Sequence, residues 1–225
     1  MADDNRLPRA LSLAVHELRT PVTVVGGYLR MLLKEQAGPL NEKQRKMIEE
    51  AERACARLSG VVAEMSDLGR LEGRELALSA QEIELTSLTT ELASDMHEGD
   101  DRGVRVEVKS PEHPLVVSGD RARVKTAVNT LMRAAVRERG EPGVITADCS
   151  VADFEGRRWA VVAIGDAAII DSLRQCRRTN DFNEWHGGLG LALPVARRVI
   201  EAHGGALWSA ADTRAASALR LPLRT

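Results

Sequence analysis

The chain has 225 residues, of which 44% are hydrophobic, so it can fill one large hydrophobic core or two small ones. Its 31 lysines and arginines nearly balance its 33 aspartates and glutamates, which excludes a chain-wide field that would attract nucleic acid or an anionic membrane. No apolar run approaches the roughly 20 residues of a membrane span, and the amino terminus lacks the apolar stretch of a signal peptide, so we expect a cytoplasmic protein. Cys55, Cys149 and Cys176 have neither disulfide nor metal-site spacing, and we expect three reduced thiols.

Apolar residues in the first 70 positions recur in alternating steps of four and three, which is the spacing of a coiled-coil seam. A break at residues 37–41 separates two such stretches and predicts the turn of an antiparallel helical hairpin. The seam positions are Leu11, Val15, Leu18, Val22, Val25, Leu29 and Leu32 in the first stretch, and Met47, Ala51, Ala54, Leu58, Val61, Met65 and Leu68 in the second.

A single hairpin with so narrow an apolar stripe buries little hydrophobic surface by itself. Two hairpins from two chains would cover the stripe by forming a four-helix bundle, so we expect a homodimer. The alternative is a hairpin that packs only against the second domain of its own chain.

From about Gln81 the pattern changes to short alternating strands interspersed with helical stretches, which predicts an α/β domain. We therefore expect an α+β protein of two domains, residues 1–75 and 76–225. The expected strands are 104–108, 115–117, 144–145, 159–164, 206–208 and 218–223, and the expected helices are 85–96, 121–139 and 191–203.

His16 lies one position off the seam of the first predicted helix, so its ring should face solvent, where another domain can reach it. Pro21 lacks an N–H and its ring is bulky, so it should free the carbonyl of Glu17 and bend the helix beside His16. A neutral imidazole is a competent nitrogen nucleophile, and a carboxylate beside it can fix its tautomer. The alternative is a surface histidine without a function.

The run His-Glu-Leu-Arg-Thr-Pro at residues 16–21 resembles the phosphoacceptor box of two-component sensor histidine kinases. The resemblance implies a dimerising hairpin in which His16 attacks the γ-phosphate of ATP. It further implies that Glu17 orients the ring or accepts its proton, and that Thr20 lies where water is positioned to dephosphorylate a partner. The similarity continues through residues 27–29, 38–40, 67–68 and 71–72.

The second domain resembles the ATP-binding domain of the same kinases, an α/β sandwich related to the ATPases of gyrase and of the Hsp90 chaperone. A glycine box opens a predicted helix that ends at a His-Gly-Gly turn, residues 203–205, in the family's order. Glycines at this position let backbone N–H groups approach phosphates at the amino end of a helix. For so short a motif, the alternative interpretation is a flexible turn. The resemblance places Gly188, Leu189, Gly190 and Leu191 at the nucleotide.

Asp166 follows an apolar strand and corresponds to the family aspartate that accepts a hydrogen bond from the adenine amino group; the alternative is a plain turn carboxylate. Ala168 and Ile170 stand at the family's next glycines, so the backbone should lose freedom and the pocket rim should gain bulk. Phe182 corresponds to the aromatic of the ATP lid, although the segment 171–187 is shorter than a typical lid and is equally compatible with a solvated basic loop.

The main departure from the family lies on the predicted helix 121–139, which in these kinases carries an asparagine that holds magnesium. The best register places Ala134 at that position, and a shift by one residue places Arg133 there. Magnesium needs oxygen ligands in near-octahedral geometry, and neither side chain offers one. The resemblance implies ATP and Mg²⁺ as cofactors, whereas Ala134 argues against the metal.

Two functions are compatible with these residues. The first is a histidine kinase core that phosphorylates His16 from ATP and passes the phosphoryl group to an aspartate of a response-regulator receiver domain. The second is a phosphotransfer or scaffold protein with a vestigial ATP site, for which a partner supplies the phosphoryl group. The expected partners are a second copy of the chain, a receiver domain and, where another chain does the sensing, a separate sensor or kinase; neither nucleic acid nor a membrane is expected.

Overall fold

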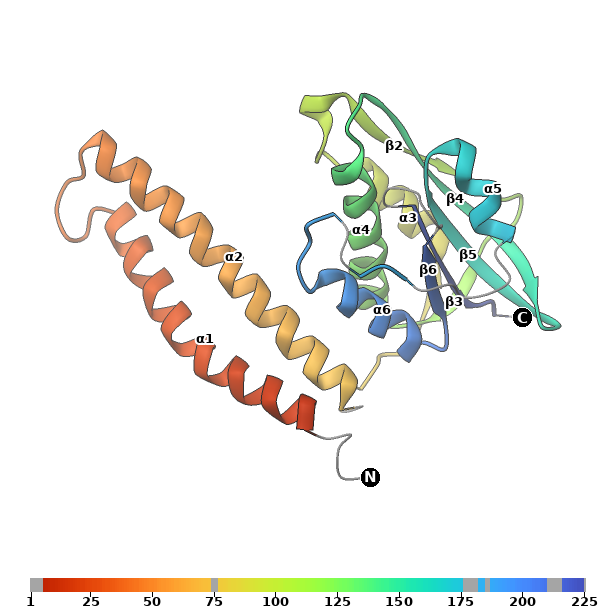
Figure 1. The fold of residues 1–225 in the computed structure, drawn as a ribbon, viewed down its shortest axis with the longest axis horizontal. Helices are drawn as coiled ribbons and strands as arrows, with labels where there is room; N and C mark the ends of the chain where they lie inside the picture. Colours follow the sequence, from red (N-terminus) through yellow and green to blue (C-terminus); the bar gives the residue numbers. More distant parts are fainter. Residues whose placement is uncertain (1–5, 74–76, 176–181, 185–186, 210–215, 225) are drawn as a thin grey trace. The chain divides into compact units, whose positions relative to one another are not determined.

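The computed structural model describes residues 6–73, 77–175, 182–184, 187–209 and 216–224. The chain divides into two compact units, Met1–Leu76 and Ala77–Thr225, and each is described by itself (Figure 1). Among the described helices, none combines the length and the apolar character needed to cross a membrane.

The first unit is a pair of long helices, α1 (Arg6–Leu33) and α2 (Glu42–Glu72), joined by a short turn (Figure 1). Asn41 caps α2, because its Oδ1 accepts the backbone N–H of Gln44 at 2.9 Å while Gln44 Oε1 accepts that of Asn41 at 3.0 Å. Gly38 in the turn has φ = +113°, which favours glycine. The hairpin predicted from the seam spacing is confirmed.

A line of buried residues marks where the two helices meet. Val15 on α1 packs inward, as do Cys55, Val62 and Gly69 on α2. The three α2 residues are spaced by seven, as in a coiled coil. A β-carbon at Gly69 would lie 3.3 Å from Leu11 Cβ, so the helices approach each other closely there. The buried line of α2 is therefore shifted by one position from the predicted seam.

The predicted seam of α2 largely faces outward in the single hairpin. Met47, Leu58 and Val61 have 63%, 57% and 41% of their surface exposed. The reason is that apolar or small residues fill two adjacent positions in each heptad, such as Val61 and Val62, and the contact with α1 selects the second. The large hydrophobic side chains found exposed in the described part of the chain all lie on the hairpin: Leu13, Leu18, Val24, Val25, Tyr28, Met31, Met47, Leu58 and Val61.

The second unit contains a five-stranded sheet in the order β2-β4-β5-β7-β6, in which β2 and β4 run parallel and the other neighbours run antiparallel. A smaller antiparallel sheet pairs β1 with β3. The predicted two-domain α+β fold, a helical hairpin followed by an α/β sandwich, is confirmed. The strands are β1 (Gln81–Glu84), β2 (Val104–Lys109), β3 (Val116–Gly119), β4 (Gly143–Phe154), β5 (Arg157–Gly165), β6 (Ala206–Ser209) and β7 (Ser217–Pro222).

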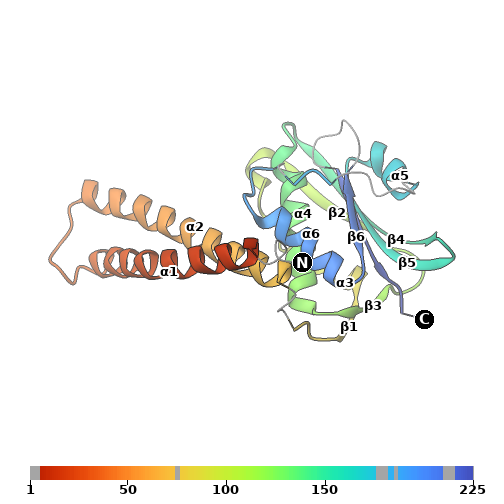
Figure 2. The same ribbon diagram turned by 60° about the horizontal axis from the view of Figure 1, so that its bottom comes forward.

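Helices cover both faces of the five-stranded sheet: α3, α4 and α6 lie on one face and α5 on the other (Figures 1 and 2). Alternation along β5 explains this arrangement. Val161 and Ala163 share a buried cluster with Ile170 and Leu173 of α5, so the intervening residues of the strand point to the opposite face. The helices are α3 (Leu85–Ser94), α4 (Arg121–Glu138), α5 (Ala167–Gln175) and α6 (Ala192–Ala202), with a short 3-10 helix at Asp100–Arg102.

His203 joins the end of α6 to the corner between β3 and α4. Its Nε2 accepts the backbone N–H of Asp120 at 2.9 Å, so the proton sits on Nδ1, which lies 2.6 Å from the carbonyl oxygen of Val199. A β-carbon at Gly119 would lie 2.5 Å from His203 Cδ2, so the ring requires glycine there. The His-Gly-Gly turn thus fixes α6 to the start of α4.

Glu84 caps the amino end of α3 with its side chain. Its carboxylate accepts the backbone N–H groups of Thr86 at 3.1 Å, Ser87 at 2.6 Å and Leu115 at 3.0 Å, together with the Ser87 hydroxyl. Partial burial alone would raise the pKa of Glu84, but these hydrogen bonds outweigh it and hold the pKa below its usual range. The carboxylate therefore stabilises the fold above the pKa that it has in the unfolded chain, and this stabilisation is lost as the pH falls through the lowered pKa.

We predict that Glu84→Gln lowers the free energy of unfolding at neutral pH by about 1–2 kcal/mol, because an amide cannot accept all of these hydrogen bonds. The difference from wild type should shrink in acid, where wild type loses the same ionised acceptor. Urea unfolding at neutral and acidic pH measures both values, and Glu107→Gln on the exposed side of β2 is the control. A difference that stays the same at both pH values would contradict the assignment.

Candidate functional site

His16 lies on the outside of α1 with 84% of its side chain exposed, as its position off the seam predicts. Its Nδ1 is 3.8 Å from Glu17 Oε1, which is too far for a hydrogen bond. A proton on Nδ1 leaves the lone pair of Nε2 free. Thr20, four residues further along the helix, is exposed on the same side.

Pro21 lies inside α1 without ending it, because the helix continues to Leu33. Since proline has no N–H, the carbonyl of Glu17 has no helical partner. Two residues later, the hydroxyl of Thr23 donates to the carbonyl oxygen of Arg19 at 2.8 Å. His16 is thus next to a part of the helix whose backbone hydrogen bonding is incomplete.

A cavity of about 460 Å³ lies beside His16, between the first part of α1 and the last part of α2. In an antiparallel hairpin these two ends are adjacent, and small Gly69 keeps them close. Sequence reasoning missed the lining of this cavity because it considered only the box around the histidine. The predicted antiparallel pairing of the two apolar stretches was the signal that could have placed the end of α2 beside His16. The lining residues are Pro8, Arg9, Ser12, Val15, His16, Arg19, Ser66, Gly69 and Arg70.

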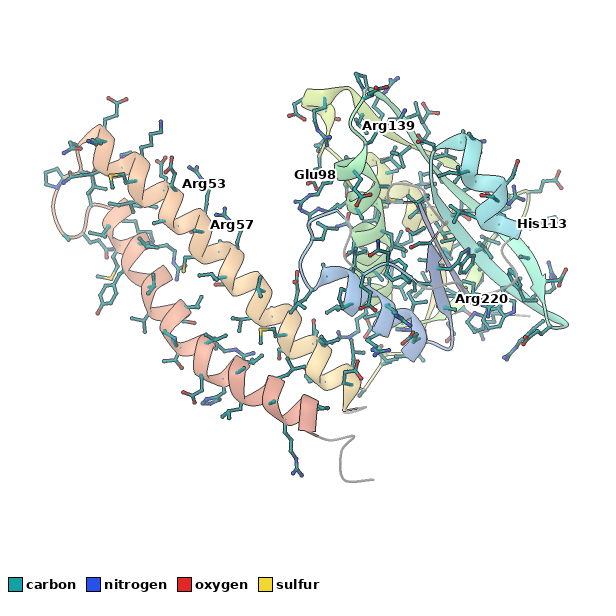
Figure 3. The ribbon with its side chains drawn as sticks, viewed as in Figure 1. Arg53, Arg57, Glu98, His113, Arg139 and Arg220 are labelled. Carbon is teal, nitrogen blue, oxygen red and sulfur yellow. The ribbon has the colours of Figure 1, made fainter. Side chains whose placement is uncertain are left out.

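Asp166 directly follows β5 and forms an ion pair with the guanidinium of Arg139 at the end of α4 (Figure 3). Arg139 is also held by its Nε, which donates to the carbonyl oxygen of Glu141 at 3.2 Å. The cavity beside this pair measures about 210 Å³, below the roughly 300–1,000 Å³ of typical small-molecule sites. The carboxylate expected to meet an adenine amino group is therefore already bonded within the chain.

Ala134 faces the segment that carries the glycine box. A β-carbon at Gly187 would lie 2.9 Å from Ala134 Cα and 3.1 Å from its Cβ, so the two segments are in close contact. Glu138 Oε1 maintains this contact by accepting the N–H of Gly187 at 2.7 Å. Arg133, the residue of the alternative register, instead pairs with Glu98 at 2.6 Å (Figure 3). The expected position of the magnesium ligand thus holds a buried methyl group.

The glycine box opens α6, as the sequence predicts. Gly187, Gly188 and Gly190 have φ values of +67°, +57° and +61°, in the left-handed region that favours glycine. Leu189 and Leu191 are half-buried, and Leu191 starts the helix without a side-chain cap. A helix amino end of this kind suits an anion, because its backbone N–H groups and its dipole favour negative charge.

The segment after Asp166 differs from the prediction. Helix α5 begins at Ala167, so Ala168 lies exposed in its first turn. Ile170 is only 2% exposed and belongs to the buried cluster on the α5 face of the sheet. The prediction that Ile170 adds bulk to the pocket rim is therefore wrong. Burial of its side chain against the sheet is more favourable than exposure at the rim.

Phe182 is 6% exposed, so its side chain is buried. The N–H of its neighbour Asn183 donates to Ser209 Oγ at 3.4 Å, at the end of β6. The alternative of a solvated basic loop over residues 171–187 does not hold at its start, because α5 extends to Gln175 and its Arg174 lies 3.6 Å from Asp148. Arg177 and Arg178 of the same segment lie outside the described residues.

The side chain at the expected metal position does not fit Mg²⁺. Within the part of the chain that the structure describes, no group of three or more His, Cys, Asp or Glu side chains is placed to hold a metal ion. The side chain of Ala134 is a methyl group and contains no oxygen. The amino end of α6 fits an anion such as phosphate, whereas Oδ1 of Asp166 already accepts from Arg139.

A family model, the His Kinase A (phospho-acceptor) domain, matches residues 9–74, which is the hairpin with His16. The circadian input-output histidine kinase CikA of Synechococcus elongatus is 27% identical over 206 residues, which cover 87% of this chain and 27% of that protein. The sensor protein DivL of Caulobacter vibrioides is 25% identical over 221 residues, covering 95% of this chain and 27% of that protein. The chain thus spans about a quarter of the length of these relatives.

Two solved structures have the same fold. Full-length ShkA in complex with AMPPNP superimposes with a TM-score of 0.70 at 21% identity, covering 97% of this chain and 46% of ShkA. The Acinetobacter baumannii histidine kinase AdeS superimposes with a TM-score of 0.58 at 18% identity, covering 93% of this chain and 98% of that chain. Both units of the chain therefore have counterparts in these structures.

We predict that the wild-type protein binds a non-hydrolysable ATP analogue weakly and independently of Mg²⁺, because Ala134 offers no ligand and Asp166 is paired. Arg139→Gln frees Asp166 and should tighten binding by about fivefold, the effect of one exposed ion pair. Calorimetric titration with and without Mg²⁺ measures both effects, and Arg105→Gln, exposed on β2, is the control. Tight, Mg²⁺-dependent binding by wild type would show that the pocket differs from this description.

Proposed function

We propose that this chain, a transmitter core of the sensor histidine kinase type, takes up a phosphoryl group on His16 and passes it to an aspartate of a receiver domain. The observation that carries the proposal is the exposed ring of His16, with the Glu17 carboxylate 3.8 Å from its Nδ1. The match of residues 9–74 to a phospho-acceptor domain supports the same assignment.

The proposed chemistry uses the tautomer of His16 that carries its proton on Nδ1. Nε2 attacks phosphorus in line with the leaving oxygen, so the Nε2–P bond forms as a P–O bond breaks. The positive charge that develops on the ring is relieved when the Nδ1 proton moves towards Glu17. In the second transfer a receiver carboxylate attacks the phosphorus, and the P–N bond breaks as Nδ1 takes its proton back, so that the ring leaves as neutral imidazole. Thr20 is exposed one turn from His16, where its hydroxyl can orient water for dephosphorylation of the partner.

Two sources can supply the phosphoryl group. Autophosphorylation from ATP is the reaction expected of the family, and the amino end of α6 supports it because it suits a phosphate. Supply by a phosphorylated partner is the second candidate, and two observations favour it. Asp166 is paired with Arg139, and Ala134 packs against the glycine segment where a metal ligand is expected. Under this candidate the second unit acts as a scaffold.

We predict that acid-labile phosphate appears on His16 when the protein is mixed with a phosphorylated receiver domain, and that His16→Gln abolishes it. ATP carrying a labelled γ-phosphate should label wild type much more slowly than the roughly 1–100 per second of ordinary kinases. His113→Gln, an exposed histidine of the second unit, is the control (Figure 3). Label retained in His16→Gln would refute the acceptor, and rapid labelling from ATP would establish the kinase reaction.

We also propose that the active form is a homodimer through the hairpins. The large exposed hydrophobic side chains of the described chain all lie on α1 and α2, and Leu18 and Val25 are 44% and 51% exposed on the seam of α1. A second hairpin with the same seam would bury them in a four-helix bundle. Phospho-acceptor hairpins of the matched family support this assembly.

We predict that Leu18→Glu combined with Val25→Glu converts the dimer into monomers, because each would bury a charge in the bundle core. The dissociation constant should rise by about 100-fold or more. Sedimentation velocity at micromolar concentration measures the change, and Glu107→Lys in the second unit is the control. A wild-type protein that is already monomeric under these conditions would contradict the assembly.

A further inference from the structure

We propose that Arg9, Arg19 and Arg70 form an anion-binding cradle that holds the phosphoryl group while it is bound to His16 and while it passes to the receiver. This inference builds on the proposed function and adds a binding site for the transferred group. It concerns the cavity of about 460 Å³ beside the histidine. The three arginines line this cavity together with the His16 ring.

Two helices supply the cradle. Arg9 and Arg19 come from α1 and flank His16 in the sequence, whereas Arg70 comes from the last turn of α2. Ser12 and Ser66 add two hydroxyl donors to the same lining. Among the described residues the lining contains no carboxylate, and its apolar residues are Pro8, Val15 and Gly69.

The described residues do not neutralise the charges of the cradle. All three arginines are exposed, and no ion pair involving them occurs among the described residues. Elsewhere in the described chain arginines do find carboxylates, as Arg133 and Arg137 do with Glu98. Three like charges around one cavity repel one another, so binding an anion there removes an unfavourable interaction.

The chemistry of the lining selects a phosphoryl group. A guanidinium presents a planar fork of N–H donors that matches the oxygens of phosphate, and serine hydroxyls can donate to the same oxygens. A phosphoryl group on Nε2 of His16 carries two negative charges at the mouth of this cavity. The arginines would neutralise the charge on its oxygens during transfer, which lowers the barrier without a proton transfer.

Arg70 gives the sharpest test because it lies outside the histidine box and on the other helix. It also lies in the last turn of α2, where any positive charge stabilises the helix end. Arg70→Lys keeps that charge but loses the fork, whereas Arg70→Gln loses both. Arg57→Gln is the matched control, because Arg57 is an exposed arginine of the same helix that does not line the cavity (Figure 3).

The experiment loads His16 chemically, so that neither ATP nor a kinase is needed. Phosphoramidate transfers its phosphoryl group to Nε2, and the P–N bond of the reagent breaks to release ammonia. The loaded protein is then mixed with an unphosphorylated receiver domain, and loss of phosphohistidine is followed by ³¹P NMR. Helical circular dichroism of each variant shows whether the hairpin is intact.

We expect Arg70→Gln to slow transfer by about tenfold, Arg70→Lys by less, and Arg57→Gln not at all. Added inorganic phosphate should slow transfer by the wild type, because free phosphate competes for the cradle, but it should not slow transfer by Arg70→Gln. This comparison distinguishes binding of free phosphate from binding of the phosphoryl group attached to His16. Equal rates for Arg70→Gln and Arg57→Gln would overturn the cradle. If Arg70→Gln loses helix content, the test rests on Arg70→Lys. A transfer rate of Arg70→Lys equal to that of wild type would show that the guanidinium fork is not used. If phosphoramidate loads wild type no better than His16→Gln, the result would instead refute the proposed function.

Discussion

The close approach of α1 and α2 is the constraint on which the first unit depends. A β-carbon at Gly69 would lie 3.3 Å from Leu11 Cβ, and one at Gly26 would lie 3.2 Å from Cys55 Sγ, so there is little room for side chains between the helices at either place. This contact fixes the rotation of α2 about its axis. One line of small residues faces inward, the neighbouring apolar line faces outward, and the polar residues of the last turns face the cavity beside His16. The reactive surface and the proposed dimer surface thus follow from one packing requirement.

The second unit differs at Asp166 and at Ala134 from the nucleotide pocket that the resemblance implies, because Asp166 pairs with Arg139 and Ala134 contacts Gly187. The free energies of these two differences show which one matters more. The pair of Arg139 with Asp166 is partly exposed, so breaking it costs about 1 kcal/mol or less. A missing metal clamp removes several kcal/mol of transition-state stabilisation. Under the proposed function, Ala134 is the larger obstacle to ATP chemistry, and the contact with Gly187 means that a longer side chain there would require the glycine segment to move.

Much of the fold could be predicted from the sequence because its signals are local. Seam spacing defined the hairpin, and alternating strands followed by the glycine box defined the second unit. The seam of α2 was misplaced by one position, because Val61 and Val62 are equally apolar and only the contact with α1 distinguishes them. Helix α5 was missed because the segment was interpreted by its resemblance to a glycine loop, whereas burial of Ile170 against the sheet determines its structure.

The candidate site was predictable only in part, for a physical reason. The exposed ring of His16 follows from its position on one helix, so the sequence predicted that exposure. Arg70 comes close to it only through the antiparallel pairing of two helices, and Arg139 meets Asp166 only through the packing of α4 beside the end of β5. Each of these pairings joins residues that are distant in the sequence, and no local motif encodes them.

The contrast between the two units bears on the direction of phosphoryl flow. A loss of several kcal/mol at the metal site corresponds to a rate lower by roughly a thousandfold or more, whereas exchange between His16 and a receiver needs no metal ligand from this chain. Under the proposed function, transfer with a partner would then be the faster of the two steps. The phosphorylation level of His16 would follow that of the receiver, and the direction of net transfer would depend on which partner carries more phosphate. A cradle of arginines fits such a role, because it lowers the barrier equally in both directions.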